Sequence, residues 1–265
     1  MLKSKTDCGG LAYRTDIDGL RALAVLSVVL FHVGAPLSGG FVGVDVFFVL
    51  SGYLITHQLR AQPPTWTTLR TFYLRRARRL LPALYVVLFT TLAAGILWLL
   101  PHQLVALTEA LTWTLGFGAN VHFAGRSGYF APAAELMPLL HTWSLAVEEQ
   151  FYFVFPLVLF GARRVGRRWA YAAVALAAAV SFVYAVWLGL RSPSDVFYAS
   201  TARVWELAVG ALATWIVVPR DRRWAHVGLV LLFASFIAIA STQVWHGLRY
   251  KTAVGCLVRM GRDGR

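Results

Sequence analysis

The chain of 265 residues is 58% hydrophobic and only 14% charged, with a mean hydropathy of +0.62. A soluble domain is about half apolar and about a quarter charged, so this composition excludes an ordinary soluble protein and favours a multi-pass membrane protein. The net charge of +13 comes largely from arginines that stand between apolar segments. That distribution is the positive-inside pattern of membrane proteins, and no nucleic-acid partner is expected.

Seven apolar segments are long enough to cross a bilayer, which takes about 20 residues. In chain order they are residues 20–36, 40–59, 81–100, 139–160, 170–190, 201–218 and 225–245. A cleaved signal peptide could resemble the first segment, but apolar segments continue to residue 248. The sequence therefore predicts an all-α transmembrane bundle of about seven spans.

The arginine clusters predict how these spans are oriented. Clusters at residues 70–79, 163–168 and 220–223 are expected in the cytoplasm, together with the N-terminus. Residues 101–138 then lie on the outer side. A single crossing by the apolar stretch 104–123 would break this parity, so that stretch is predicted to be an interfacial or re-entrant helix.

The chain divides by composition into one membrane domain and two tails. Residues 1–12 are expected to be an N-terminal cytoplasmic tail, and residues 13–248 the membrane domain. Residues 249–265 are basic, contain glycine and have no apolar run. Because this tail follows an outward-pointing span, the membrane domain is expected to be incomplete at its C-terminal end.

The first two predicted spans contain ionisable residues, which are costly in a membrane and usually functional. His32 follows Arg21 by three helical turns, so both lie on one face about 16 Å apart. A hydrogen bond to a neighbouring helix is the structural alternative for His32. Asp45 is the carboxylate of the second span and needs a histidine or arginine partner from another helix. Ser51 adds a small polar residue about two turns later.

The stretch HTWSLAVEEQFY, residues 141–152, places polar residues at the start of a predicted span. Helical spacing puts His141, Ser144 and Glu148 on one face within about 60°, with Glu149 about a quarter turn away. An interfacial cap with Trp143 in the aromatic belt would explain Trp143 and Glu149, but it explains the polar face less well. This face is expected to line an outer cavity.

The predicted loop FYLRRARRLLP belongs to a stretch with five arginines between Arg70 and Arg79. Orientation and contact with anionic lipids could account for them. Arginine clusters also bind phosphates through paired hydrogen bonds, so a cytosolic phosphorylated ligand is a second interpretation. Neither a phosphate-binding glycine loop nor a metal-ligand cluster is present in the sequence, and no metal is expected.

Four segments, in order and spacing, resemble the integral-membrane acyltransferase-3 family. They are YRTDIDGLRALAVLSVVLFH, GGFVGVDVFFVLSGYLIT, FYLRRARRLLPAL and LLHTWSLAVEEQFYFVFP, within residues 13–245. The family includes bacterial O-acetyltransferases of lipopolysaccharide, peptidoglycan and other envelope glycans. The resemblance implies a protein of the bacterial inner membrane that transfers an acyl group, usually acetyl, from cytosolic acetyl-CoA to a glycan hydroxyl outside. Family members commonly have more helices than this chain.

The resemblance also implies roles for individual residues. Arg21 and His32 fit the family's first-helix motif, and His32 would be the general base, since a histidine pKa lies near the operating pH. Asp45 or Glu148 could orient its ring. The family's arginine motif, thought to hold the CoA phosphates, corresponds to Arg75, Arg76, Arg78 and Arg79.

On the acceptor side, Ser51, His141, Ser144 and Glu149 are the candidate residues. Direct transfer and a covalent acyl-enzyme both remain open, with Ser51 and Ser144 as the possible carriers.

Two other functions are compatible with the sequence. A transporter or flippase of lipid-linked glycans could use intramembrane histidine and carboxylates as a proton relay. An odd number of spans without inverted repeats fits transporters poorly, and dependence on acyl-CoA would discriminate the two. The third interpretation is an inactive remnant.

Overall fold

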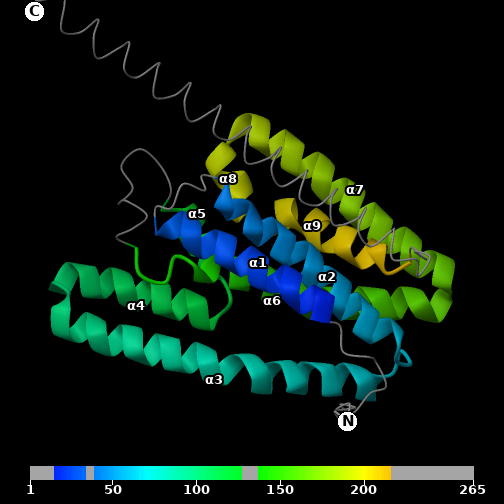
Figure 1. The fold of residues 1–265 in the computed structure, drawn as a ribbon, viewed down its shortest axis with the longest axis horizontal. Helices are drawn as coiled ribbons and strands as arrows, with labels where there is room; N and C mark the ends of the chain where they lie inside the picture. The colour runs from blue at the N-terminus through cyan, green and yellow to red at the C-terminus, as the bar shows by residue number, and fades with distance from the viewer. Residues whose placement is uncertain (1–14, 34–38, 127–136, 216–265) are drawn as a thin grey trace, which may run out of the picture. The chain divides into compact units, whose positions relative to one another are not determined.

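The computed structural model describes residues 15–33, 39–126 and 137–215, and every regular element in these ranges is a helix (Figure 1). The helices are α1 (Thr15–His32), the short 3-10 helix η1 (Gly40–Val42), α2 (Gly43–Arg60), α3 (Trp66–Trp98), α4 (Pro101–Leu115), α5 (Ala119–Ala124), α6 (Thr142–Val165), α7 (Arg167–Arg191), α8 (Pro193–Tyr198) and α9 (Ser200–Ala213). The all-α prediction is confirmed for these residues. The described residues divide into two compact units, the first up to Leu50 and the second from Ser51 onward.

In the first unit, two glycines allow η1 and the start of α2 to pack closely on α1. A Cβ atom at Gly40 would collide with the Ser27 carbonyl, and one at Gly43 with the Ala24 carbonyl. The Ser27 hydroxyl donates to that Ala24 carbonyl at 2.8 Å. Small residues therefore perform here the close-packing role that they commonly have between membrane helices.

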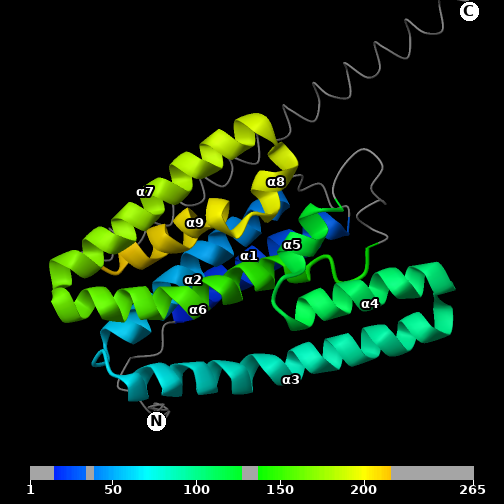
Figure 2. The same cartoon turned by 180° about the vertical axis from the view of Figure 1, so that it is seen from behind.

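The second unit is built from helical hairpins (Figures 1 and 2). Helices α3 and α4 run back along each other after a short turn at Leu99, and α6 and α7 reverse at Gly166. Helix α9 then packs along α7. The second half of α2 lies directly against α9, because a Cβ atom at Gly52 would collide with the backbone of Leu207.

The C-terminal ends of three helices meet on one side of the second unit. The Arg163 guanidinium of α6 donates to the Leu59 carbonyl of α2 at 2.7 Å. The Arg60 guanidinium donates to the Thr214 hydroxyl at 2.8 Å and lies 4.2 Å from the centre of the Trp215 ring. The C-terminal ends of α2, α6 and α9 thus lie together on one side of the second unit. Their position in the cytoplasm stays a prediction.

Four helical segments in the described ranges are long and apolar enough to cross a membrane. They are Gly40–Arg60, Trp66–Trp98, Thr142–Val165 and Arg167–Arg191. Only 17% of the apolar window of α3 and of α7 is buried within the protein, so the rest is available to lipid. The chain is therefore a membrane protein with transmembrane helices.

The prediction of seven spans is not confirmed. Helix α1 carries three charged residues, Asp16, Asp18 and Arg21, within its 18 residues. Helix α9 ends at Ala213, five residues before the predicted end of its span. Residues 225–245, like the predicted tails 1–12 and 249–265, lie outside the described residues.

The structure corrects one local prediction. The predicted loop at residues 70–79 is wrong, because α3 is continuous from Trp66, where the Thr65 side chain caps its first turn. Arginine and leucine are good helix formers, so the arginines lower the local hydropathy without ending the helix.

The stretch 104–123 falls in two helices, α4 and α5. The longer, with 15 residues, extends about 22 Å and cannot cross a core of about 30 Å.

Candidate functional site

The carboxylates of α6 lie inside the helix bundle. Glu148 and Glu149 are 8% and 5% exposed. Because α6 begins at Thr142, both lie beyond its first turn, which excludes a role as N-terminal caps. Glu149 also precedes Arg163 by 14 residues, about 21 Å along the helix axis. These are therefore buried carboxylates within a helix that is long and apolar enough to cross a membrane, and such groups need a partner and usually have a function.

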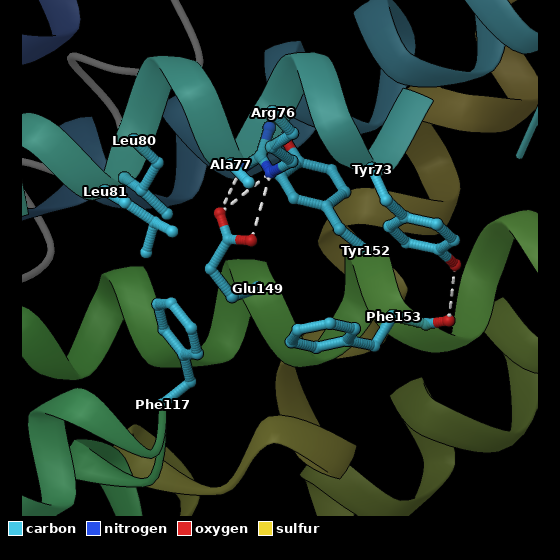
Figure 3. A pocket seen from close by; sticks show the side chains of 9 residues that line it. All are labelled: Tyr73, Arg76, Ala77, Leu80, Leu81, Phe117, Glu149, Tyr152 and Phe153. Atoms are coloured by element: carbon cyan, nitrogen blue, oxygen red, sulfur yellow. Dashed lines mark hydrogen bonds and ion pairs between the residues drawn. The ribbon is translucent and has the colours of Figure 1, made fainter. Parts of the chain in front are cut away.

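The partner of Glu149 is Arg76 of α3. The Arg76 Nε donates to Glu149 Oε1 at 2.8 Å and Oε2 at 3.1 Å, and Nη2 donates to Oε1 at 2.5 Å. Figure 3 shows the guanidinium reaching from α3 toward the carboxylate on α6. Such multiple charge-assisted hydrogen bonds fix the geometry of both groups.

The neighbouring arginines of α3 point elsewhere. Successive residues of a helix are 100° apart, so Arg75, Arg78 and Arg79 share an arc of about 100° on the outer side of α3. All three side chains are exposed, and within the described ranges none has a hydrogen bond or ion pair. The structure thus separates Arg76 from the rest of the arginine motif.

Tyr152 joins the two carboxylates into one cluster. Its hydroxyl donates to Glu148 Oε1 at 2.5 Å, and the Arg76 guanidinium lies 3.5 Å from the centre of its ring. Ser51 of α2 lies within hydrogen-bonding reach of the Tyr152 side chain. Arg76 Nη2 is 3.9 Å from Glu148 Oε1. We refer to Ser51, Arg76, Glu148, Glu149 and Tyr152 as the buried polar cluster.

A pocket of about 270 Å³ between α3 and α6 lies next to this cluster (Figure 3). Its walls are mostly apolar and aromatic, and Arg76 and Glu149 supply its charged groups. The lining residues are Tyr73, Arg76, Ala77, Leu80, Leu81, Phe117, Glu149, Tyr152 and Phe153. A mostly apolar pocket with a few convergent polar groups is the usual form of a small-molecule site.

The structure brings together four of the predicted site residues, Ser51, Arg76, Glu148 and Glu149. It does not bring the start of the HTWSL stretch into the same hydrogen-bonded group. His141 is exposed at the N-terminus of α6 and its carbonyl accepts a hydrogen bond from Ser144 Oγ at 3.2 Å.

The remaining predicted residues belong to the first unit. His32 Nδ1 lies 2.8 Å from the Val28 carbonyl. Because a carbonyl only accepts, Nδ1 carries the hydrogen and Nε2 keeps its lone pair in the neutral ring. Asp45 is half-buried in the first turn of α2. The Arg21 guanidinium lies 5.1 Å from the centre of the Phe47 ring.

Sequence reasoning missed Tyr152 and Phe117. A signal for Tyr152 was available, since it follows Glu148 by four residues and so shares its helical face. Phe117 stands in a turn between two glycines, and no periodic pattern marks it. Among the residues that the structure describes, no group of three or more His, Cys, Asp or Glu could hold a metal ion.

Comparison with known proteins identifies relatives along most of the chain. A family model described as "Acyltransferase domain" matches residues 14–257. "Putative membrane-bound transacylase BcsY" of Komagataeibacter xylinus is 36% identical over 246 residues, 92% of this chain and 60% of that protein. "Putative peptidoglycan O-acetyltransferase YrhL" of Bacillus subtilis is 37% identical over 222 residues, 79% of this chain and 34% of that protein.

A third relative is "Putative O-acetyltransferase SAS0844" of Staphylococcus aureus. It is 38% identical over 152 residues, 56% of this chain and 25% of that protein. The chain thus spans between a quarter and three-fifths of the length of these relatives. No solved structure was found to match it.

Proposed function

Because the chain belongs to the membrane acyltransferase-3 family, we propose that it transfers an acetyl group from cytosolic acetyl-CoA to a hydroxyl of an envelope glycan such as lipopolysaccharide. The observation that carries this proposal is the buried polar cluster beside an apolar pocket, inside helices that can cross a membrane. The printed names of the relatives, which include O-acetyltransferases, support the same reaction class. The protein is proposed to lie in the bacterial inner membrane with a cytoplasmic N-terminus.

The general base of the proposed reaction is His32. Its Nε2 lone pair is free of the hydrogen bond that Nδ1 makes to the Val28 carbonyl. The acceptor hydroxyl gives its proton to Nε2 while its oxygen attacks the thioester carbonyl carbon. A carbon–oxygen bond forms, the carbon–sulfur bond breaks, and CoA leaves as the thiolate, which receives the proton. The family resemblance assigns the orientation of the imidazole to Asp45 or Glu148.

Arginines outside the buried polar cluster hold the phosphates of the donor. Arg75 and Arg79 have exposed guanidinium groups suited to paired hydrogen bonds with phosphate. The family resemblance assigns Arg21 to binding of the donor as well. Arg76 has a different role, because its guanidinium is already hydrogen-bonded to the Glu149 carboxylate. Arg76 holds the Glu149 side chain at the pocket and compensates the negative charge of that carboxylate.

The acceptor glycan is assigned to the N-terminal half of α6 and the adjoining part of α2. Ser51 and Glu149 belong to the buried polar cluster, and His141 and Ser144 stand at the start of α6. Hydroxyl, imidazole and carboxylate groups are suitable hydrogen-bonding partners for the hydroxyls of a sugar.

The test is transfer of label in membranes that contain this chain. Acetyl-CoA labelled in the acetyl group is supplied, and label is followed into envelope glycans for wild type and for His32→Ala. We expect incorporation by wild type and a loss of about 100-fold or more in the variant, as for removal of a general base. A membrane-inserted His32→Ala protein that retains full transfer would exclude His32 as the base. Absence of transfer by wild type would contradict the proposed function.

A further inference from the structure

The turn between α4 and α5 has an unusual backbone conformation. Phe117 has φ of +53°, in the left-handed region that glycine prefers. Phe117 stands between Gly116 and Gly118, yet the left-handed position is occupied by the phenylalanine and not by either glycine. A bulky residue in this region is held there by its surroundings, and such conformations cluster at functional sites.

A closed ring of side-chain hydrogen bonds holds this turn. Gln150 Nε2 donates to the Phe117 carbonyl at 2.7 Å and to Asn120 Oδ1 at 2.9 Å. Ser200 Oγ donates to Gln150 Oε1 at 2.5 Å, and Asn120 Nδ2 donates to Ser200 Oγ at 3.0 Å. The ring connects the turn before α5 with α6 and the start of α9. Gln150 is therefore the residue that fixes the Phe117 backbone to α6.

The side chain that this turn presents forms a wall of the pocket. Figure 3 shows Phe117 beside Glu149, and its ring centre lies 6.1 Å from that of Phe153. Leu80 and Leu81 of α3 also line the pocket. Apart from the ion pair, these walls offer few hydrogen-bonding groups. They suit the alkyl part of an acyl group better than a sugar, whose hydroxyls would lose their hydrogen bonds with water.

We infer that Phe117 limits the length of the acyl group that the pocket between α3 and α6 accepts, and that Gln150 positions it. The inference rests on the proposed function, and it assigns that function's donor end to this pocket. A longer acyl chain has to displace the Phe117 ring, which cannot withdraw while Gln150 holds its backbone. Close-packed apolar walls discriminate chain length because an added methylene finds no room.

Binding of S-alkyl-CoA thioethers tests this inference without any transfer, because a thioether has no acyl group to give. Purified protein in nanodiscs is titrated with the methyl, ethyl, butyl and hexyl thioethers. For wild type we expect the affinity to fall by about tenfold for each methylene beyond the length that fits. In Phe117→Gly, which also suits the left-handed backbone, that dependence on length should largely disappear.

Two further variants separate this role from a general effect on folding. Gln150→Glu keeps the size of the side chain but loses the hydrogen bonds that Gln150 Nε2 donates to the Phe117 carbonyl and to Asn120 Oδ1. As in Phe117→Gly, the dependence of affinity on chain length should become weaker, although Phe117 is still present. Phe89→Ala removes an aromatic ring that is 68% exposed on α3, outside the pocket, and should leave the preference unchanged.

The inference is overturned if Phe117→Gly has the same length preference as wild type, or if wild type binds none of the thioethers. An unchanged preference in Gln150→Glu would remove its positioning role. Acetyl transfer by wild type is measured separately. If wild type transfers acetyl groups but Phe117→Gly has an unaltered length preference, the proposed function stands and this inference is rejected. If the length preference of Phe117→Gly is altered but wild type shows no transfer, this inference stands and the proposed function is rejected.

Discussion

Replacement of Arg76 by methionine should destabilise the protein strongly, because it leaves Glu149 buried without its cation. The Glu149 side chain is 6% exposed, and that of Arg76 is 27% exposed. Removal of one partner of a buried ion pair costs about 3–5 kcal/mol. Since Arg76 retains some contact with solvent, we expect the lower end, about 3 kcal/mol, which is about 150-fold in the unfolding equilibrium.

The reverse substitution should cost less. In Glu149→Gln, the Arg76 guanidinium still has Glu148 at 3.9 Å and the Tyr152 ring beneath it. Loss of the charge-assisted hydrogen bonds alone is expected to cost about 1.5–3 kcal/mol. The double variant with methionine at 76 and leucine at 149 should recover much of the stability, because no unpaired charge remains.

Unfolding in mixed micelles with an increasing fraction of dodecyl sulfate, followed by circular dichroism, measures these differences. Arg75→Met is the matched control, since Arg75 is adjacent in the chain but exposed. It should change stability by less than about 0.5 kcal/mol. Equal effects of Arg76→Met and Arg75→Met would refute the reasoning that the ion pair is a buried structural contact.

Three other predictions concern packing, the buried hydroxyl and pH. Gly52→Ala should lower the thermal unfolding midpoint, because the added Cβ atom collides with the backbone of α9, whereas Gly161→Ala has open space around it and should not. Tyr152→Phe removes the hydroxyl that donates to the buried Glu148 carboxylate. It should lower the free energy of unfolding by about 1–3 kcal/mol, measured as for Arg76→Met, and should also lower acyl transfer activity. Burial lowers the pKa of His122, so the unfolded state binds more protons than the folded state just below the ordinary histidine pKa. From about pH 7.5 to about pH 5.5, the unfolding midpoint should therefore fall further for wild type than for His122→Phe.

The long apolar helices were predictable from local sequence. Helices α2, α6 and α7 begin and end within a few residues of the predicted spans, because their apolar runs match the lipid core. The N-terminal part of α3 was missed since hydropathy falls at the arginines, although arginine favours a helix. The arginine clusters predicted only the side of the membrane on which these helices end, and the contacts of Arg60 and Arg163 do not test that prediction.

The candidate site was predictable only in part. The carboxylates of α6 were recognised from their unusual place in a span, but their partner Arg76 is 73 residues away, and no local pattern shows which arginine of the motif turns inward. That choice depends on how α3 packs against α6. The left-handed conformation of Phe117 was equally hidden, because either flanking glycine would have been the expected choice for it.

The central claim is that an acyl group passes from a cytosolic donor to an envelope glycan through this protein. Oriented membrane vesicles test it most directly. Acetyl-labelled acetyl-CoA is added to inverted vesicles, whose cytoplasmic face is outside, and to right-side-out vesicles, and alkali-labile label on the glycan is counted. We expect incorporation in inverted vesicles that contain the chain, and background levels in right-side-out vesicles and in membranes without it. Background levels in both orientations would contradict transfer from a cytosolic donor.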